Sequence, residues 1–481
     1  VSSLPAASRE RPGCGNILPY TLSMTYAFLC STLSTLVALR GASAVGLPRF
    51  RVGSPEAAET AAKLNAAEKW WTQLGDHVYH EPDEGSPLSA NIEDYYYAVG
   101  SLDALDPEVT SRRVGGGGRL HLFELPAEVA PAALLQIGQN LGDRRSSISR
   151  FHQLQTGTTL SSVFPKYMLS DGYENPLSSA GQQVEHAAVE QVTVDSFKLY
   201  LDKVTGLWTR SATNASASAL IVEMAQKEFI RLEYTTCLQT FSTSQGRLRN
   251  VIAFAPGAEQ GAVVVGAHYD SRPFTGAAPG AEDNGSGLAA LLAMARAFKE
   301  AKVVNKKPVY FVAFAGEESG LLGSARFAPE ILKGGGSIPT ECGPRAQSFL
   351  QLQGRRREDM AALIMDEVGW VSKDPAYPKR TVNLESMDSS RAVMDHMAAS
   401  CKDHNGADAL DIIHNSNPFG SDHMSFLNNG ISAVLSINAD DEAYPNYHKS
   451  TDTIENVTPE YATQIAKMNM GALLRLSGVE A

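Results

Sequence analysis

Four short apolar segments in the second half of the chain constrain the fold more than any other feature of the sequence. They are AVVVGA at residues 262–267, PVYFVAF at 308–314, AALIM at 361–365 and GISAVLSI at 430–437. Short, almost continuously apolar runs are typical of strands buried on both faces of a largely parallel sheet. We therefore expect these four segments to be neighbours in one buried sheet.

A helical pattern separates the first two of these segments. In SGLAALLAMARAFKEA the apolar residues recur every three or four positions, and Ser286 stands where an N-cap is expected. Strands that alternate with helices point to an α/β domain. We predict a three-layer α/β/α sandwich around a mostly parallel mixed sheet.

Charge argues against one class of partner. The 481 residues carry a formal net charge of −12 and the sequence pI is about 5.5. Nucleic-acid phosphates require a basic surface, so we expect no nucleic-acid partner.

The N-terminal residues have the pattern of a targeting segment. Residues 16–39 contain no charge, with Arg9 and Arg11 before them and Arg40 after them, and Ala42-Ser43-Ala44 matches a cleavage site. We predict a signal peptide or signal anchor at 1–44, with cleavage favoured. The rest would then be secreted and extracellular. A lumenal or outward-facing anchored form is the alternative, and only an uncleaved anchor would contact a membrane.

Residues 45–185 differ in pattern from the C-terminal part of the chain. Their periodicity is weak, and they contain a glycine tract at 115–118 and dibasic pairs at 112–113 and 144–145. Flexible segments with dibasic cleavage sites suggest a pro-segment-like region at 45–185, followed by the main domain at 186–481. After cleavage of the leader, three cysteines remain, which permits one disulfide without fixing the pair: Cys237, Cys342 and Cys401.

Histidine and acidic residues come after the predicted strands. In order, they are His268, Asp270, Asp283, Glu317, Glu318, Asp366 and His448. Singly, each has an ordinary explanation, such as a helix-capping turn for Asp283 or a loop position for His448. In α/β sheets, however, functional groups gather at the carboxyl ends of the strands. Together these residues therefore predict one site.

Nitrogen and carboxylate ligands without thiolates suit zinc in an open site, although cobalt or manganese would also fit. The seven residues lie in five segments of the chain, and one ligand from each segment would be too many for one tetrahedral ion that keeps a water. Five such ligands suit two ions that share one bridging carboxylate, which leaves one of the adjacent glutamates, Glu317 and Glu318, as a base. The sequon at Asn284 would then be buried in the site, whereas those at Asn214 and Asn456 suit a glycoprotein.

The motifs HYD, EDNGSG, GEESGLLGS, MD and HKSTDT, in this order, resemble the M28 family of di-zinc aminopeptidases, specifically the secreted leucine aminopeptidase type. The resemblance covers about residues 190–475, and it implies that the sandwich is of the zinc exopeptidase type. It also implies two Zn²⁺ ions, with Asp283 as the bridging ligand. Glu318 and His448 would complete one ion, and His268 and Asp366 the other.

Catalytic roles are implied by the same resemblance. Glu317 would be the general base, and Asp270 would orient His268, as Asp452 would orient His448. Asp422 and His423 match a segment that lines the family's site. Tyr444 or Tyr447 is a candidate oxyanion donor, and an ordinary surface tyrosine is the alternative for each. The peptide bond between Asp283 and Asn284 would be cis.

The implied activity is metal-dependent removal of N-terminal, Leu-like residues from peptides with a free N-terminus. Two departures stand out. Glu367 replaces an apolar residue at the pocket edge, where an inward side chain would favour basic substrates and an outward one would change nothing. The loop at 333–358 is longer than the family core requires and is either disordered or folded over the site. The alternatives are a glutaminyl-peptide cyclotransferase of the same fold and a non-catalytic, receptor-like relative.

Overall fold

The computed structural model describes residues 166–480, with gaps at 244–245, 334–339, 343–355, 374–376, 378, 407–408 and 417–419, and shorter stretches between residues 48 and 153. The expected signal peptide or anchor at 1–44 lies outside the described residues. Within the described part of the chain, no helix has both the length and the apolar character needed to span a bilayer.

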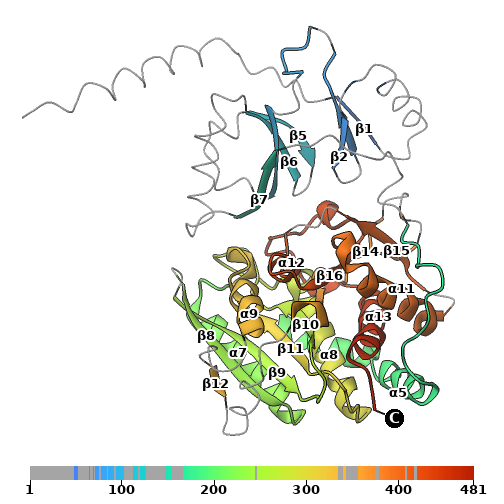
Figure 1. The fold of residues 1–481 in the computed structure, drawn as a ribbon. Coiled ribbons are helices and arrows are strands. Elements are labelled where there is room, and N and C mark those ends of the chain that lie inside the picture. Colours follow the sequence, from blue (N-terminus) through green and yellow to red (C-terminus); the bar gives the residue numbers. More distant parts are fainter. Residues whose placement is uncertain are drawn as a thin grey trace, which may run out of the picture. The chain divides into compact units, whose positions relative to one another are not determined.

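A nine-stranded mixed sheet forms the centre of residues 166–480 (Figure 1), in the order β12-β8-β9-β11-β10-β13-β16-β14-β15. Its strands are β8 (Thr235–Thr243), β9 (Gly246–Ala255), β10 (Ala262–His268), β11 (Val309–Phe314), β12 (Thr340–Cys342), β13 (Met360–Met365), β14 (Thr381–Glu385), β15 (Asp411–Asn415) and β16 (Ser432–Asn438). The four apolar segments form β10, β11, β13 and β16, which are parallel neighbours at the middle of the sheet. The predicted fold class is therefore confirmed.

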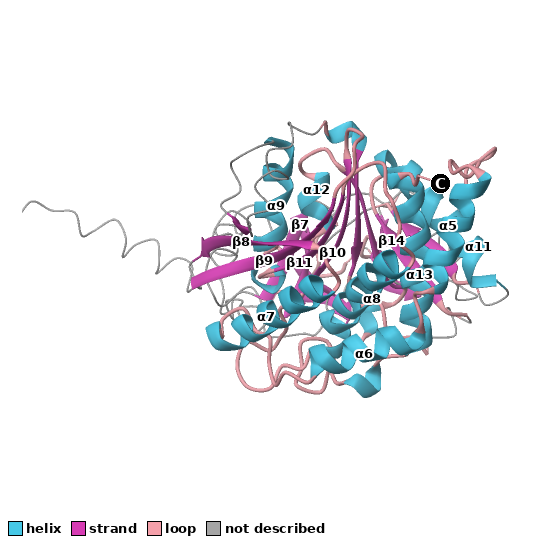
Figure 2. Ribbon diagram, turned by 90° about the horizontal axis from the view of Figure 1, so that it is seen from below, coloured by secondary structure: helices cyan, strands magenta, loops and turns pink. Residues whose placement is uncertain are grey.

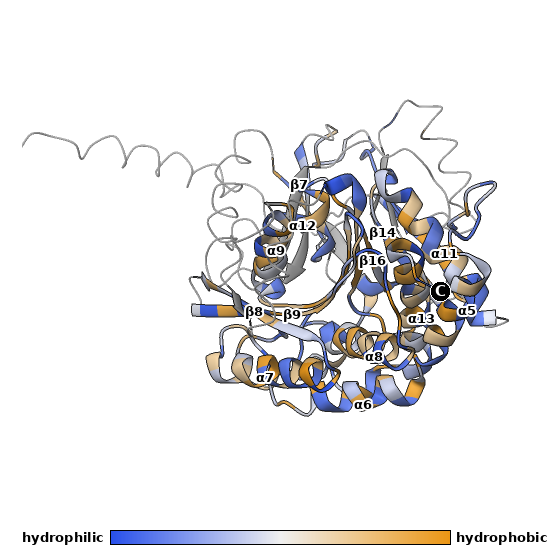
Figure 3. Ribbon diagram, turned by 60° about the horizontal axis from the view of Figure 1, so that its bottom comes forward, coloured by the Kyte–Doolittle hydropathy of each residue, from blue (hydrophilic) through white to orange (hydrophobic). Residues whose placement is uncertain are grey.

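Helices cover both faces of this sheet (Figure 2). One layer contains α5 (Ser179–Glu190), α6 (Val194–Thr205), α7 (Ala215–Arg231), α8 (Gly287–Glu300), α11 (Arg391–Asn405) and α13 (Pro459–Ser477). The other contains α9 (Leu322–Lys333) and α12 (His423–Leu427), whose Phe327 and Phe426 pack on the opposite face of the strands. Figure 3 shows α8 as mainly apolar, whereas α6 and α7 alternate between apolar and hydrophilic residues, as expected of helices with one face in solvent.

The start of α8 differs from the prediction. Ser286 precedes the helix, but its side chain makes no capping hydrogen bond. Its hydroxyl instead donates to the main-chain oxygen of Glu282 and accepts from the main-chain N–H of Val368. Ser286 therefore connects the loop before α8 to the loop after β13.

The described stretches before residue 154 form two small antiparallel sheets. One has the order β1-β3-β2 and consists of β1 (Arg49–Arg51), β2 (Trp71–Leu74) and β3 (His77–His80). The other has the order β5-β6-β4-β7 and consists of β4 (Tyr95–Ser101), β5 (Arg113–Gly117), β6 (Leu120–Glu124) and β7 (Ser147–Gln153). The weakly periodic region thus contains strands, including the aromatic sequence YYYAVGS, which forms β4.

Cysteines and sequons differ in their surroundings. Cys237 on β8 is disulfide-bonded and lies in register opposite Cys342 of β12, whereas Cys401 is free and buried. Within the long 333–358 loop, β12 pairs with β8 and forms the edge strand of the sheet. Asn284 is fully buried, as predicted, and Asn214 is exposed at the N-terminus of α7.

Helices α6 and α7 are joined by a partly buried carboxylate. Glu228 of α7 accepts hydrogen bonds from the hydroxyl of Tyr200 at 2.6 Å and from Nη2 of Arg231 at 2.6 Å. Burial by itself would raise the pKa of Glu228, but the hydrogen bonds from Arg231 and Tyr200 outweigh it and lower the pKa to about 2. The ionised carboxylate therefore stabilises the folded state.

We predict that Glu228→Gln lowers the free energy of unfolding at neutral pH by about 1–3 kcal/mol, because the hydrogen bonds lose their charged acceptor. The folded pKa lies below the ordinary value of 4.5, so the contribution is complete above about pH 4.5 and is lost as the pH falls toward 2. Urea unfolding of the wild-type and Glu228→Gln proteins measures this. The difference between their free energies of unfolding should be smaller in mildly acidic buffer than in neutral buffer.

The matched control is Glu223→Gln on the same helix, where the carboxylate forms an exposed pair with Lys227. Exposed pairs contribute roughly 0–1 kcal/mol, so a loss as large as that of Glu228→Gln would contradict the prediction.

Candidate metal centre

The register of two parallel strands brings the first pair of site residues together. Gly266 of β10 lies opposite Ile364 of β13, so that two residues further along, His268 and Asp366 are at the same level. Nε2 of His268 is 3.3 Å from Oδ1 of Asp366. Both side chains are buried at the carboxyl edge of the sheet, as the sequence predicts.

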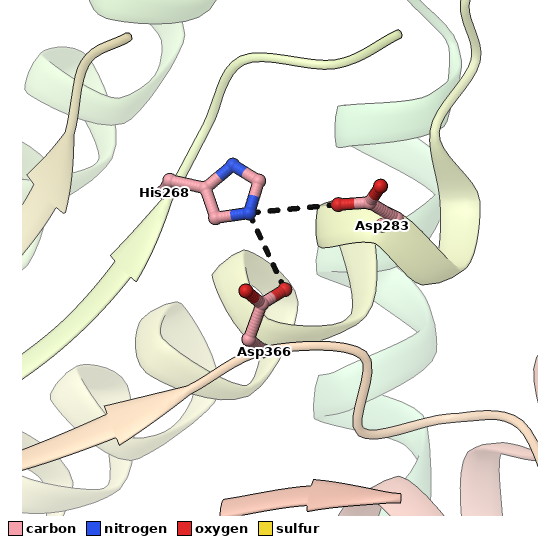
Figure 4. Close-up of side chains that lie close together, drawn as sticks. All are labelled: His268, Asp283 and Asp366. Carbon is pink, nitrogen blue, oxygen red and sulfur yellow. Dashed lines mark hydrogen bonds and ion pairs between the residues drawn. The ribbon is translucent and has the colours of Figure 1, made fainter. Parts of the chain in front are cut away.

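Asp283 lies between two histidines. It belongs to the short turn η4 (Ala281–Ser286) that precedes α8, and its peptide bond to Asn284 is cis, as the family resemblance implies. Oδ1 of Asp283 is 3.5 Å from Nε2 of His268 (Figure 4), and Oδ2 is 3.2 Å from Nε2 of His448. Each carboxylate oxygen therefore faces a different histidine, which is the arrangement a bridging ligand needs.

Glu318 completes the second group. Its Oε2 is 2.8 Å from Nε2 of His448, which comes from the loop after β16. Two three-residue groups result, each with ligand atoms within 4.8 Å of one another: His268, Asp283 and Asp366, and Asp283, Glu318 and His448. The donors are imidazole nitrogens and carboxylate oxygens, and Oε1 of Glu318 is buried without a hydrogen-bond partner in the described structure. This donor set fits a divalent metal in each group.

The adjacent glutamates diverge because they lie in a turn. Gly316 has φ 71°, which favours glycine, and the 3₁₀ turn η5 (Glu317–Ser319) comes directly after it. Glu318 points to His448, whereas Oε2 of Glu317 is 3.8 Å from Nε2 of His268. Glu317 belongs to neither three-residue group, so the two neighbours lie in different surroundings.

The carboxylate of Asp270 holds this turn. It accepts from the main-chain N–H groups of Gly316 at 2.8 Å, Glu317 at 3.1 Å and Glu318 at 3.3 Å. Nδ1 of His268 donates to the main-chain oxygen of Asp270 at 3.1 Å and lies 3.7 Å from its carboxylate. Asp270 thus contacts His268 mainly through its backbone, while its side chain positions the two glutamates.

Asp452 holds the turn that contains Asp283. Its carboxylate accepts from the main-chain N–H groups of Glu282 and Asp283, both at 3.0 Å, and from the hydroxyl of Tyr444 at 2.6 Å. It therefore anchors the turn that contains Asp283. Tyr444 is buried with its hydroxyl proton committed to Asp452, so it is neither a surface tyrosine nor an oxyanion donor. Tyr447 stacks on the His448 ring, with the ring centroids 3.6 Å apart.

Sequence reasoning missed Ser421 and the long-range contact of Asn284. Ser421 donates to Oδ2 of Asp366 at 2.8 Å, and it directly precedes the buried Asp422 and His423. Asn284 donates to the main-chain oxygen of Met365 at 3.0 Å, which connects the Asp283 turn to the strand before Asp366. The GSDH segment was a usable signal for Ser421, whereas the contact of Asn284 crosses 81 residues and has no local signature.

Glu282 and Glu367 are also buried. Glu282 accepts from the main-chain N–H groups of Gly369 and Trp370, so it holds the segment that comes after Asp366. The exposed fraction of Glu367 is 1%, and its φ is 47°. The side chain of Glu367 is therefore buried, and its position at the edge of a substrate pocket stays a prediction.

Several carboxylates are buried close together in the site, and their pKa values are raised. Burial raises the pKa of Glu317 and of Glu318 well above the ordinary value, and it raises that of Asp422 to about 7. Burial opposes the charge of His268, but Asp366 and Glu317 raise its pKa well above 6.5. These shifts mark a site with an excess of negative charge, which a bound cation would reduce.

We predict that Asp452→Asn weakens metal binding by about 10–100-fold, because the Asp283 turn loses its ionised anchor. Competition with a chromophoric chelator measures this affinity. Asp395→Asn is the matched control, because Asp395 is a buried acceptor for the hydroxyl of Tyr167 and the N–H of Ser170, remote from the ligands in sequence. Similar weakening in both variants would contradict a specific role for Asp452.

Comparisons with known proteins agree with this fold. The solved structure of Legionella pneumophila LapA aminopeptidase aligns with a TM-score of 0.52 at 18% identity, over 80% of this chain and 98% of that one. Legionella pneumophila LapB aligns with a TM-score of 0.51 at 18% identity, over 80% and 99%. At these identities the likeness establishes a shared fold.

Two sequence relatives add to this. Aminopeptidase YwaD of Bacillus subtilis is 30% identical over 44% of this chain and 40% of its own length. A probable leucine aminopeptidase of Trichophyton verrucosum is 29% identical over 47% and 57%. The chain thus spans about half the length of these curated relatives. The model of peptidase family M28 matches residues 250–473, which contain every residue of the two metal groups. Over these residues, the chain is similar to peptidase family M28.

Proposed function

We propose that this protein is a metal-dependent aminopeptidase that hydrolyses the first peptide bond of peptides with a free N-terminus. The observation that carries the proposal is the position of Asp283, whose two carboxylate oxygens face His268 and His448 and so link the two groups. The match of residues 250–473 to the model of peptidase family M28 and the names of the sequence relatives support the same activity.

In this proposal, two zinc ions are held by the five residues of the two groups: His268 and Asp366, Glu318 and His448, and the shared Asp283. When bound, zinc supplies Lewis-acid chemistry, polarising the scissile carbonyl and lowering the pKa of a nearby water. Asp270 holds the turn that presents Glu317 and Glu318, and Asp452 holds the turn of Asp283.

Glu317 is the proposed general base. It lies beside His268 but outside both metal groups, so its carboxylate is available to take a proton. As the water oxygen bonds to the carbonyl carbon, Glu317 accepts the water proton and then delivers it to the nitrogen of the departing amine when the C–N bond breaks. The excess of buried carboxylates would also attract the α-ammonium group of the substrate, which would restrict cleavage to free N-termini.

We predict that Glu317→Gln lowers the hydrolysis rate by about 10²–10⁴-fold while metal content stays at the wild-type value, because the variant loses a base and no ligand. Glu318→Gln, the same change one residue away, should lower the metal content itself. The measurement is mass spectrometry of zinc-loaded protein incubated with peptides beginning with Leu, Lys, Gln or acetyl-Leu, with metal content determined in parallel.

Chelator-sensitive release of single residues from free N-termini, with acetyl-Leu left intact, is the expected result. Ammonia loss from the Gln peptide without hydrolysis would instead indicate the cyclotransferase. A Glu317→Gln protein that also loses metal would contradict the prediction, because Glu317 would then act as a metal ligand.

The relatives named leucine aminopeptidase lead us to propose Leu-like residues as the preferred N-terminus. Glu367 modifies this, because a buried carboxylate beside Asp366 would favour a basic side chain. Glu367→Gln should therefore raise the ratio of Leu release to Lys release several-fold. An unchanged ratio would show that Glu367 does not contact the substrate side chain.

Secretion, with residues 45–185 as an inhibitory pro-segment, completes the proposal. A disulfide at Cys237 and an exposed sequon at Asn214 suit an oxidising compartment. Residues from Lys166 onward pack against β15 and α11, and Tyr167 donates to Ile412 and Asp395. Proteolytic removal of the chain before Lys166 should raise activity, and unchanged activity would refute inhibition.

A further inference from the structure

Arg210 is a fully buried cation close to the site that no step of the proposed mechanism uses. It lies between α6 and α7, and its side chain has no solvent exposure. Its guanidinium donates to three main-chain oxygens: from Nε to Tyr269 at 2.8 Å, from Nη2 to Gly280 at 2.8 Å, and from Nη1 to Pro279.

These acceptors belong to the two loops that carry ligands. Tyr269 lies between His268 and Asp270, and Gly280 lies three residues before Asp283. Gly280 has φ 50°, and a Cβ atom there would lie only 3.0 Å from Nη2 of Arg210 and 2.5 Å from the main-chain oxygen of Asp283. The guanidinium therefore fills the space between the two loops at close range.

The backbone around Arg210 is fastened to the same region. The N–H of Arg210 donates to the hydroxyl of Ser271 at 3.1 Å, and that hydroxyl donates to the main-chain oxygen of Ala278 at 2.7 Å. The N–H of Ala278 in turn donates to the main-chain oxygen of Trp208 at 3.0 Å. Arg210 thus has little freedom to move away from the ligand loops.

Its charge is not neutralised by contact. Within the part of the chain that the structure describes, Arg210 forms no ion pair, since its acceptors are all carbonyl groups. Burial lowers the pKa of Arg210 to about 10, while Asp452 and Asp283 oppose this shift, so the group stays charged at neutral pH. A cation bonded only to carbonyls leaves its field available to the carboxylates of the site.

We propose that Arg210 is a positioning residue, which holds the His268–Asp270 loop and the Asp283 loop at the separation that shared metal ligation requires. This inference rests on the proposed function, because it concerns the affinity of the same two metal groups. A three-way donor with fixed planar geometry is needed, which arginine supplies and lysine does not.

The test measures metal affinity in folded protein at neutral pH, by chelator competition with zinc, for Arg210→Gln and for Arg475→Gln. Arg475 is the matched control, because it is also buried but pairs with Glu185 and Asp403 on helices α5 and α11. We expect affinity to fall at least about tenfold in Arg210→Gln and to stay at the wild-type value in Arg475→Gln, although both lose thermal stability. Wild-type affinity in folded Arg210→Gln would overturn the inference.

Arg210→Lys decides the matter if the Gln variant does not fold. Lysine keeps the charge but does not donate to all three carbonyls. We therefore expect the zinc affinity of Arg210→Lys to lie between those of the wild-type and Gln proteins. If the Gln variant does not fold, the zinc affinity of Arg210→Lys should still lie well below that of the wild type. Wild-type affinity in Arg210→Lys would overturn positioning, because charge alone would then suffice. A wild-type protein that binds no zinc would overturn the proposed function and this inference with it, whereas equally tight binding by wild type and Arg210→Gln overturns this inference alone.

Discussion

The rest of the site depends on the carboxylate of Asp283, whose two oxygens face two different histidines. Asp283 must present its oxygens to His268 and His448 simultaneously, so its turn can tolerate little movement. Three contacts from distant parts of the chain restrain that turn: Asp452 accepts from its backbone, Asn284 donates to Met365, and Arg210 donates to Gly280. The ligand is thus positioned from outside its own segment.

The same arrangement crowds like charges in a dry environment. Glu317, Glu318 and Asp366 approach the two histidines where burial disfavours ionised groups. Such a site is unfavourable for folding by itself and must be offset elsewhere. The central strands β10, β11 and β13 are buried at every position, and helices cover both of their faces, so the apolar core supplies the compensating stability.

Local patterns predicted the sheet and the residues at its edge. The apolar runs became β10, β11, β13 and β16, and the polar residues after them meet where parallel strands end. What the patterns lacked was the identity of long-range partners. The carboxylate of Asp270 bonds to amides 46 to 48 residues away, and the hydroxyl of Ser286 bonds to an amide 82 residues away instead of capping its helix. Hydrogen bonds of this kind depend on packing, which spacing along the chain does not encode.

The two metal groups differ in how their ligands are attached to the backbone. His268 and Asp366 lie at the ends of the adjacent strands β10 and β13, which pack closely, since a Cβ at Gly266 would lie 2.9 Å from Cδ1 of Ile364. His448 comes from an irregular loop, with φ 57°. Loops open locally at low free-energy cost, whereas central strands open only with the whole domain. With both groups occupied as proposed, an ion held by the group that contains His448 should exchange with solution faster than one held by the group that contains His268.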